Sequence, residues 1–350
     1  MTTRNIVVLA GAAVVLGAAA YMTSSGRKFN TPALNGKQVV ADFAAADVAE
    51  IKVGDKLALA AGEKGWTVKS LHGYPADVSK IRENILKLRD LKVGQVARGR
   101  KIASPVKVEL KGSDGKVLAG LEMGEQHMSK PRGQMAQFGG GGYPDGRYVK
   151  FRDEVVLVKD ALDAFDGDFK KWIDARICAV PASDVTEVAF AKGASKVELK
   201  RKDSSWVLEG LGEKEELDSS KTYSLDSALS YLDMTGLADP KLSEAELGFA
   251  TGSVYTVKLK DGKSYTAKIG NVAGGDRYFK VSAAFSPVGT NAVENAALEK
   301  AVKEFNDRNS KWTYTIASYS ADSMSKDRKD LVKAKEEPKS DDKKDDSTNK

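Results

Sequence analysis

The strongest constraint on the fold is a short pattern that occurs twice in the chain. The stretch ADVAEIKV begins at Ala46, and a similar stretch, SDVTEVAF, begins at Ser183. In both, apolar and polar residues alternate as they do in a half-buried strand. Two further short runs follow in each copy, separated by turns, and the last begins with tryptophan, at Trp66 and Trp206. This order predicts a small antiparallel meander in each copy.

The similarity between the copies continues beyond the meander. Residues 78–91 and 225–232 have apolar side chains spaced three and four apart, as on one face of a helix. Each copy then has a hairpin with an Asp-Gly turn and a strand that begins Arg-Tyr. Each ends in a predicted helix, over residues 161–172 and 292–305. The sequence therefore predicts two tandem repeats of one α+β unit, because the repeats are too long and too few for a solenoid.

The predicted organisation has five parts. A signal anchor or signal peptide covers residues 1–25, and a linker covers 26–40. The two α+β repeats cover 41–177 and 178–318. A disordered charged tail covers 319–350, because its mixed charges leave little apolar surface to bury.

The first part contains an uncharged apolar run from Ile6 to Met22. As a helix it would span about 26 Å, slightly less than the roughly 30 Å hydrocarbon core of a bilayer. Two interpretations stay open: an uncleaved transmembrane anchor, and a signal peptide whose cleavage releases a secreted protein. Basic residues on both sides of the run, Arg4 and Arg27 among them, leave its orientation open. We favour the anchor, with the main body on the extracytoplasmic, periplasmic face.

The repeat resembles a bacterial family, the domain of unknown function DUF4340. The motifs that carry the resemblance are Asp47-Val48 with Ile51, Trp66, Tyr74-Pro75-Ala76-Asp77, Asp114-Gly115 with Gly124, and Arg147-Tyr148-Val149. They cover residues 42–176 well and the second copy more weakly. The resemblance implies a bacterial envelope location behind a membrane segment, and for some members an accessory part beside ABC-type transport or gliding-associated systems. It implies no catalytic residues.

The charge of the chain does not indicate a nucleic-acid partner. The net charge is +6 over 350 residues, and it is spread along the sequence. The nearest basic block consists of Arg98, Arg100 and Lys101, which is small beside the concentrated face of a nucleic-acid binder. We interpret this block as a solvated loop.

Recognisable catalytic and metal-binding patterns are also missing. The single cysteine, Cys178, lies in an apolar stretch and is predicted to be a buried thiol. His72 and His127 have neither catalytic nor metal-ligand spacing. The acidic cluster at 163–168 lacks the spacing of a calcium loop. We therefore expect no enzyme activity, no cofactor and no metal.

An insertion in the first copy is the candidate binding feature. The stretch MSKPRGQMAQFGGGGYP, from Met128 to Pro144, stands where the second copy has a short turn. Its four glycines are not followed by the Lys-Ser/Thr of a phosphate-binding loop. We predict a partner-binding loop whose adaptable apolar contacts come from Met128, Met135, Phe138 and Tyr143.

The leading hypothesis is a non-catalytic, membrane-anchored extracytoplasmic protein. It would act as an interaction or scaffold component of an envelope assembly, accessory to an ABC-type transport system, with the membrane and other envelope proteins as partners. The alternative is an exported carbohydrate- or peptidoglycan-binding module, which requires Trp66 or Trp206 to be accessible. A hydrolase with paired carboxylates ranks last, because no cleft can be recognised from the sequence.

Overall fold

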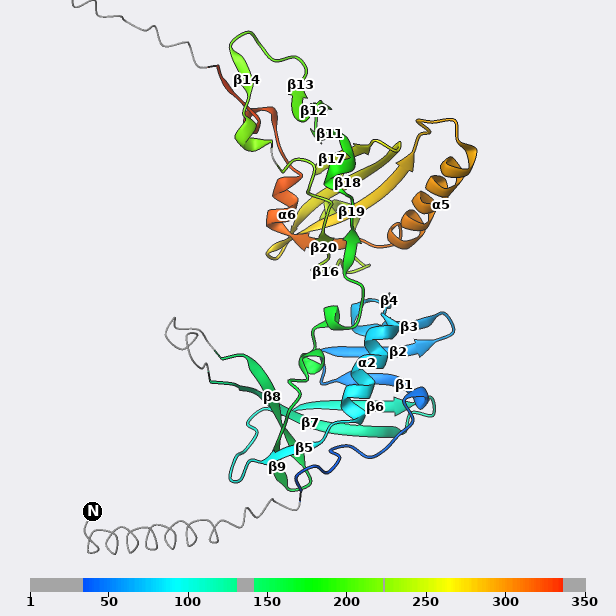
Figure 1. Ribbon diagram of the computed structural model, residues 1–350, viewed down its shortest axis with the longest axis vertical. Coiled ribbons are helices and arrows are strands. Elements are labelled where there is room, and N and C mark those ends of the chain that lie inside the picture. The colour runs from blue at the N-terminus through cyan, green and yellow to red at the C-terminus, as the bar shows by residue number, and fades with distance from the viewer. Residues whose placement is uncertain (1–33, 131–141, 223, 336–350) are drawn as a thin grey trace, which may run out of the picture. The chain divides into compact units, whose positions relative to one another are not determined.

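The described part of the chain divides into two compact units (Figure 1). The computed structural model describes residues 34–130, 142–222 and 224–335. Unit 1 consists of the described residues up to Ser70 and of Pro75–Trp172. Unit 2 consists of Leu71–Tyr74 and of the described residues from Ile173 onward. The main division thus falls a few residues before the predicted one at 177/178.

Unit 1 is built on one sheet in which the strands from β3 to β5 in the order below pair antiparallel. Among the described residues its strand order is β4-β3-β2-β1-β6-β7-β8-β9-β5. In chain order the strands are β1 (Val48–Val53), β2 (Leu57–Gly62), β3 (Gly65–Val68), β4 (Tyr74–Pro75), β5 (Val93–Val96), β6 (Val106–Gly112), β7 (Val117–Met128), β8 (Pro144–Phe151) and β9 (Glu154–Val158). The first three are the predicted meander.

The helix α2 (Val78–Arg89) crosses the sheet of unit 1 in Figure 1. Asp77 begins it, because its carboxylate accepts hydrogen bonds from the backbone N–H groups of Ser79 at 2.8 Å and Lys80 at 3.2 Å. Its buried apolar side chains are Ile81, Ile85 and Leu88. The predicted helix and its apolar stripe are therefore present.

Unit 2 contains a second antiparallel sheet, of order β13-β12-β11-β17-β18-β19-β20-β16 among the described residues. Its strands are β11 (Val185–Lys192), β12 (Ser195–Lys202), β13 (Ser205–Leu208), β16 (Gly236–Leu237), β17 (Ser253–Leu259), β18 (Lys263–Ala273), β19 (Asp276–Phe285) and β20 (Tyr314–Ala317). Two separate pairs join β10 (Arg176–Cys178) to β15 (Leu232–Asp233) and β14 (Glu215–Leu217) to β21 (Val332–Ala334). The helices are α4 (Glu244–Leu247), α5 (Ala292–Asn309) and α6 (Ser318–Ser323).

Both units are thus α+β, with a large antiparallel sheet and few helices. In each sheet the strand that carries the tryptophan, β3 or β13, is followed by the other two strands of its meander in reverse chain order. The two hairpin strands and the strand with the Arg-Tyr pair, β8 or β19, come next. The strands that match in sequence therefore occupy matching places.

Two predicted helices are wrong. Residues 161–172 form two short 3-10 turns, η3 (Asp163–Asp166) and η4 (Phe169–Lys171), because Leu162 and Gly167 are left-handed on either side of η3. Most of residues 225–231 form turns, and Leu232 begins β15. There the Ser227 hydroxyl donates to the carbonyl of Ser224 at 3.1 Å, an interaction that competes with helix formation.

Two predicted boundaries also need correction. The linker was placed at 26–40, but Val39 and Val40 are buried, and the Val39 N–H donates to the carbonyl of Leu91 at 2.9 Å. The predicted disordered tail at 319–350 contains most of α6 and all of β21, and Leu331 within it is fully buried. In both places a few apolar residues in a polar stretch suffice to fix the chain against a unit.

The predicted N-terminal membrane segment at 1–25 lies outside the described residues. Within the described ranges, every helix is too short or too polar to cross a bilayer.

We expect Leu88→Ala to destabilise unit 1 by about 2–5 kcal/mol, because the side chain is fully buried and its removal leaves a cavity. Leu86→Ala is the matched control, since Leu86 is on the same helix but only half-buried. Chemical unfolding followed by circular dichroism measures both losses. Equal losses would contradict the burial of this helix face.

The thiol of Cys178 should be unreactive in the folded protein. It is 1% exposed, and burial raises its pKa to about 12. A raised thiol pKa depletes the reactive thiolate at every pH below that value. We expect no labelling by Ellman's reagent at about pH 8, close to the pKa of an exposed thiol, and complete labelling after denaturation. Labelling without denaturant would show that β10 is not packed as described.

Candidate functional site

The predicted binding loop leaves the sheet of unit 1 between β7 and β8. Met128 pairs with Pro144 at the end of the ladder, and just beyond it the Ser129 N–H donates to the carbonyl of Tyr143 at 2.9 Å. The Ser129 hydroxyl donates to the same carbonyl at 3.0 Å. We call Met128, Ser129 and Tyr143 the hairpin base. These bonds hold the two ends of the insertion together.

The apolar members of the hairpin base face solvent. Met128 is 49% exposed and Tyr143 is 64% exposed. Large apolar side chains that stay exposed are typical of contact surfaces when they occur together. Met135 and Phe138, the other predicted contact residues, lie outside the described residues, as do Gly139, Gly140 and Gly141.

A hollow of about 550 Å³ opens on unit 1 beside the hairpin base; we call it the hairpin hollow. It is lined by Gln95, Val96, Ala97, Arg98, Gly99, Arg100, His127, Tyr148 and Leu157. The first six belong to β5 and the loop after it, whereas His127 and Tyr148 belong to β7 and β8. The volume falls within the range of small-molecule and side-chain pockets.

Arg100 is held in place from two sides. Its guanidinium carbon lies 3.7 Å from the centroid of the Tyr148 ring. Its Nε and one terminal nitrogen donate to Oε1 of Glu125 at 3.0 and 2.5 Å. Its hydrogen bonds hold the pKa of the Glu125 carboxyl below its usual value. The predicted solvated loop is indeed exposed, but Arg100 within it has a defined position.

His127 forms a second polar pair at the hollow. Its Nδ1 lies 2.6 Å from Oδ1 of Asp145, and its ring meets the edge of Tyr148 at 5.8 Å between centroids. A histidine oriented by a carboxylate is also part of a catalytic triad. However, the described residues that line the hollow carry neither an aliphatic hydroxyl nor a thiol. The described lining thus offers basic and aromatic side chains around a carboxylate-paired histidine.

The opposite face of β8 is fixed by a buried arginine. Arg147 is 3% exposed, and its guanidinium donates to Oδ1 of Asp166 in η3 at 2.5 Å. Gln126 in β7 donates to the other oxygen of Asp166 at 3.4 Å. Gly146 is required next to it, because a Cβ there would approach the carbonyl oxygen of Val158 to 2.4 Å. These contacts fasten the root of the hairpin to the rest of unit 1.

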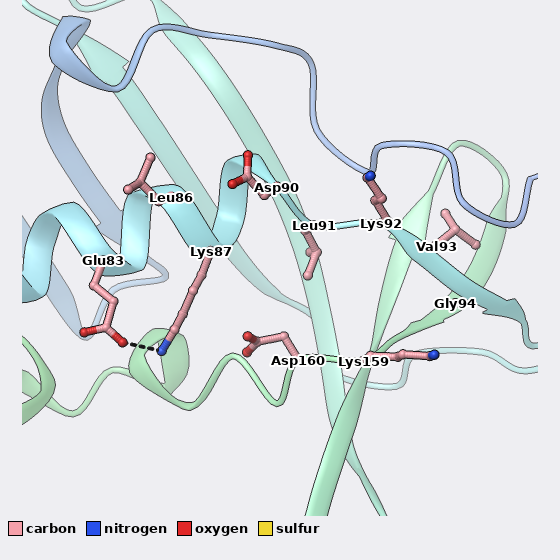
Figure 2. Close-up of a pocket in the computed structure, with 10 residues that line it drawn as sticks. All are labelled: Glu83, Leu86, Lys87, Asp90, Leu91, Lys92, Val93, Gly94, Lys159 and Asp160. Carbon is pink, nitrogen blue, oxygen red and sulfur yellow. Dashed lines mark ion pairs between the residues drawn. The ribbon is translucent and has the colours of Figure 1, made fainter.

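A larger hollow of about 750 Å³ lies at the end of α2 (Figure 2). Its charges balance, with three lysines and three carboxylates at Lys87, Lys92, Lys159, Glu83, Asp90 and Asp160. Lys87 reaches Glu83 at 2.7 Å, as the dashed line in Figure 2 shows. Asp160 accepts a hydrogen bond from the backbone N–H of Leu162 at 2.7 Å. Local interactions thus occupy several of these groups, and this hollow is the weaker candidate.

The acidic cluster at 163–168 has structural roles. Asp163 pairs with Lys171 at 2.6 Å, and Asp168 accepts from the backbone N–H of Lys170 at 2.9 Å. The part of the chain that the structure describes contains no group of three histidine, cysteine or carboxylate side chains placed for a metal ion. His72 is exposed and belongs to no such group.

The two tryptophans of the alternative hypothesis are half-buried. The guanidinium carbon of Arg201 lies 4.7 Å from the Trp206 ring centroid, and Arg201 also pairs with the carboxylate of Asp226. One face of Trp206 is therefore covered by protein. A sugar-binding platform needs one open ring face, so the cover on the opposite face of Trp206 does not decide between the two hypotheses.

Comparison with known proteins gives one match. The model of a family described as a domain of unknown function, DUF4340, matches residues 66–250, which is just over half of the chain. The match includes β8, the described residues of the hairpin hollow and the first strands of unit 2. No curated protein and no solved structure matches the chain.

We expect Asp166→Asn to destabilise unit 1 by about 1–3 kcal/mol, because it leaves the buried guanidinium of Arg147 without a charged partner. Asp163→Asn in the same turn is the control. Its ion pair with Lys171 is about half exposed on both sides, so its loss should cost less than about 1 kcal/mol. Denaturant unfolding measures the difference, and a control loss as large as that of Asp166→Asn would refute this role for Arg147.

Proposed function

Because the chain belongs to the DUF4340 family, we propose that it is a non-catalytic interaction component of a bacterial envelope assembly. The hairpin base is its docking element. The observation that supports this role most directly is that Met128 and Tyr143, one on each of the two chain segments at the root of an inserted loop, are both exposed. A contact surface needs apolar anchors of this kind.

The rigid setting of the hairpin base supports the same role. Arg147 and Asp166 fasten β8 from within the unit, and Ser129 closes the loop at its root. A partner that binds there meets a surface that is already ordered. Little conformational entropy then has to be lost on binding.

We further propose that the two units arose by duplication of one α+β unit. The matching strand orders and the matching positions of Trp66 and Trp206 support this. Only the first copy has the insertion, so docking would be a property of unit 1, with unit 2 and its long helix α5 available for a different contact.

The location that we propose is the extracytoplasmic face of a membrane, with residues 1–25 as the anchor. Its support is the uninterrupted apolar run from Ile6 to Met22. An accessory place beside an ABC-type transport system is the assembly that we would look for first.

The test is affinity purification of the full chain from detergent-solubilised membranes of its native host after mild crosslinking, with partners identified by mass spectrometry. We expect envelope proteins to be recovered in fixed proportion with the wild type. The double variant Met128→Ser, Tyr143→Ser should lose most of them, because its apolar anchors are gone.

The matched control is Val272→Ser, Val293→Ser, which removes two exposed apolar side chains from unit 2. It should retain the partners of the wild type. If the wild type is recovered alone, or if the hairpin variant retains every partner, the proposal of docking through the hairpin base is wrong.

A further inference from the structure

The lining of the hairpin hollow carries basic side chains but no acidic one. Its lining contains the guanidinium groups of Arg98 and Arg100 and the imidazole of His127, and no carboxylate belongs to the lining. The hollow at the end of α2 differs, since its three lysines face three carboxylates. Outside the lining of the hairpin hollow, Glu125 pairs with Arg100 and Asp145 pairs with His127. Among the described residues Arg98 has no such carboxylate partner, so its charge is not offset, and its field within the hollow attracts an anion.

Arg98 is available to such an anion. Its side chain is exposed and forms no hydrogen bond or ion pair with another described residue. The turn that carries it is defined: the Arg100 N–H donates to the carbonyl of Ala97 at 3.1 Å, and Gly99 has a φ of +73°, which favours glycine. The backbone at the root of Arg98 is thereby fixed.

Arg100 is prepared for binding in a different way. It stacks on Tyr148 and uses two of its nitrogens on Glu125. An arginine guanidinium has five N–H donors, and those that do not bond to Glu125 remain for a second acceptor. A guanidinium that is already oriented loses less entropy when it binds a second carboxylate.

We propose that the hairpin hollow binds the carboxylate of an acidic side chain on a protein partner, through Arg98 and Arg100. This inference rests on the proposed function, because it names the chemistry of the segment that docks at the hairpin base. Planar guanidinium groups match carboxylates by paired hydrogen bonds. Met128 follows His127 in β7 across a register shift of the ladder, so we expect the segment to carry an apolar residue in addition to its acidic one.

The test uses the full chain in detergent and two fluorescein-labelled peptides. One alternates glutamate with leucine, and in the other glutamine replaces every glutamate. Fluorescence anisotropy at about 0.15 M salt, where surface charges beyond roughly 8 Å are screened, measures the affinity. We expect the acidic peptide to bind at least about tenfold more tightly, as charge-assisted hydrogen bonds imply.

Arg98→Gln and Arg100→Gln should each weaken binding of the acidic peptide about tenfold and leave the neutral peptide unchanged. Lys159→Gln, in the hollow at the end of α2, changes the net charge equally and should have no effect. Circular dichroism checks the fold of each variant; Arg98 is exposed, so Arg98→Gln keeps the test valid even if Arg100→Gln disturbs the loop.

Three outcomes would overturn the inference. Equal weakening by Lys159→Gln would show general charge attraction. Equal affinity for the two peptides would show that the carboxylate is not recognised. Displacement of the acidic peptide by inorganic phosphate at concentrations where glutarate has no effect would assign the hollow to phosphate. The proposed function is tested separately by the affinity purification. It would fail if the Met128→Ser, Tyr143→Ser variant retained its partners, and this result does not depend on the peptide affinities.

Discussion

The structure depends on the burial of one face of each antiparallel sheet. In unit 1, Ile51 pairs with Leu59 on one side and with Leu110 on the other, and all three are fully buried. In unit 2, Val188 has the same relation to Leu199 and Val257. A slip of one residue in any of these pairings would turn the whole row toward solvent. This cost fixes the register, and the register decides which side chains meet elsewhere in the sheet.

The site follows from that register through β8. Arg147 points into the unit, where Asp166 neutralises it, and Tyr148 points to the other face, where Arg100 stacks on it. Neighbouring residues of one strand thus have different roles: Arg147 attaches the strand to the core, and Tyr148 lines the hairpin hollow. The exposed pair Met128 and Tyr143 lies at the end of the same ladder. A single strand therefore connects the core of unit 1 to the docking surface that we propose.

Much of the fold was predictable because it is encoded locally. The alternation of apolar and polar residues predicted the meanders. The spacing of Ile81, Ile85 and Leu88 after Asp77 predicted α2. The helix predicted at 161–172 failed because a left-handed Leu162 cannot be recognised from composition. The hairpin insertion could be recognised from the sequence, since it has no counterpart in the second copy, and its role in binding stays a prediction. The pairs of the hairpin hollow could not: Arg100 and Glu125, or His127 and Asp145, meet only after register and loop path are set.

The closed root of the hairpin has a consequence for how such a protein evolves. Hydrogen bonds between Ser129 and Tyr143 hold together the two points at which the chain leaves and rejoins the sheet. The entropy of closing a loop grows only slowly with its length. We therefore expect changes in the length of the segment between these two residues to cost little stability. Selection can adjust this segment to a new partner without first compensating a loss of stability, so we expect it to diverge faster than the strands on which it is mounted.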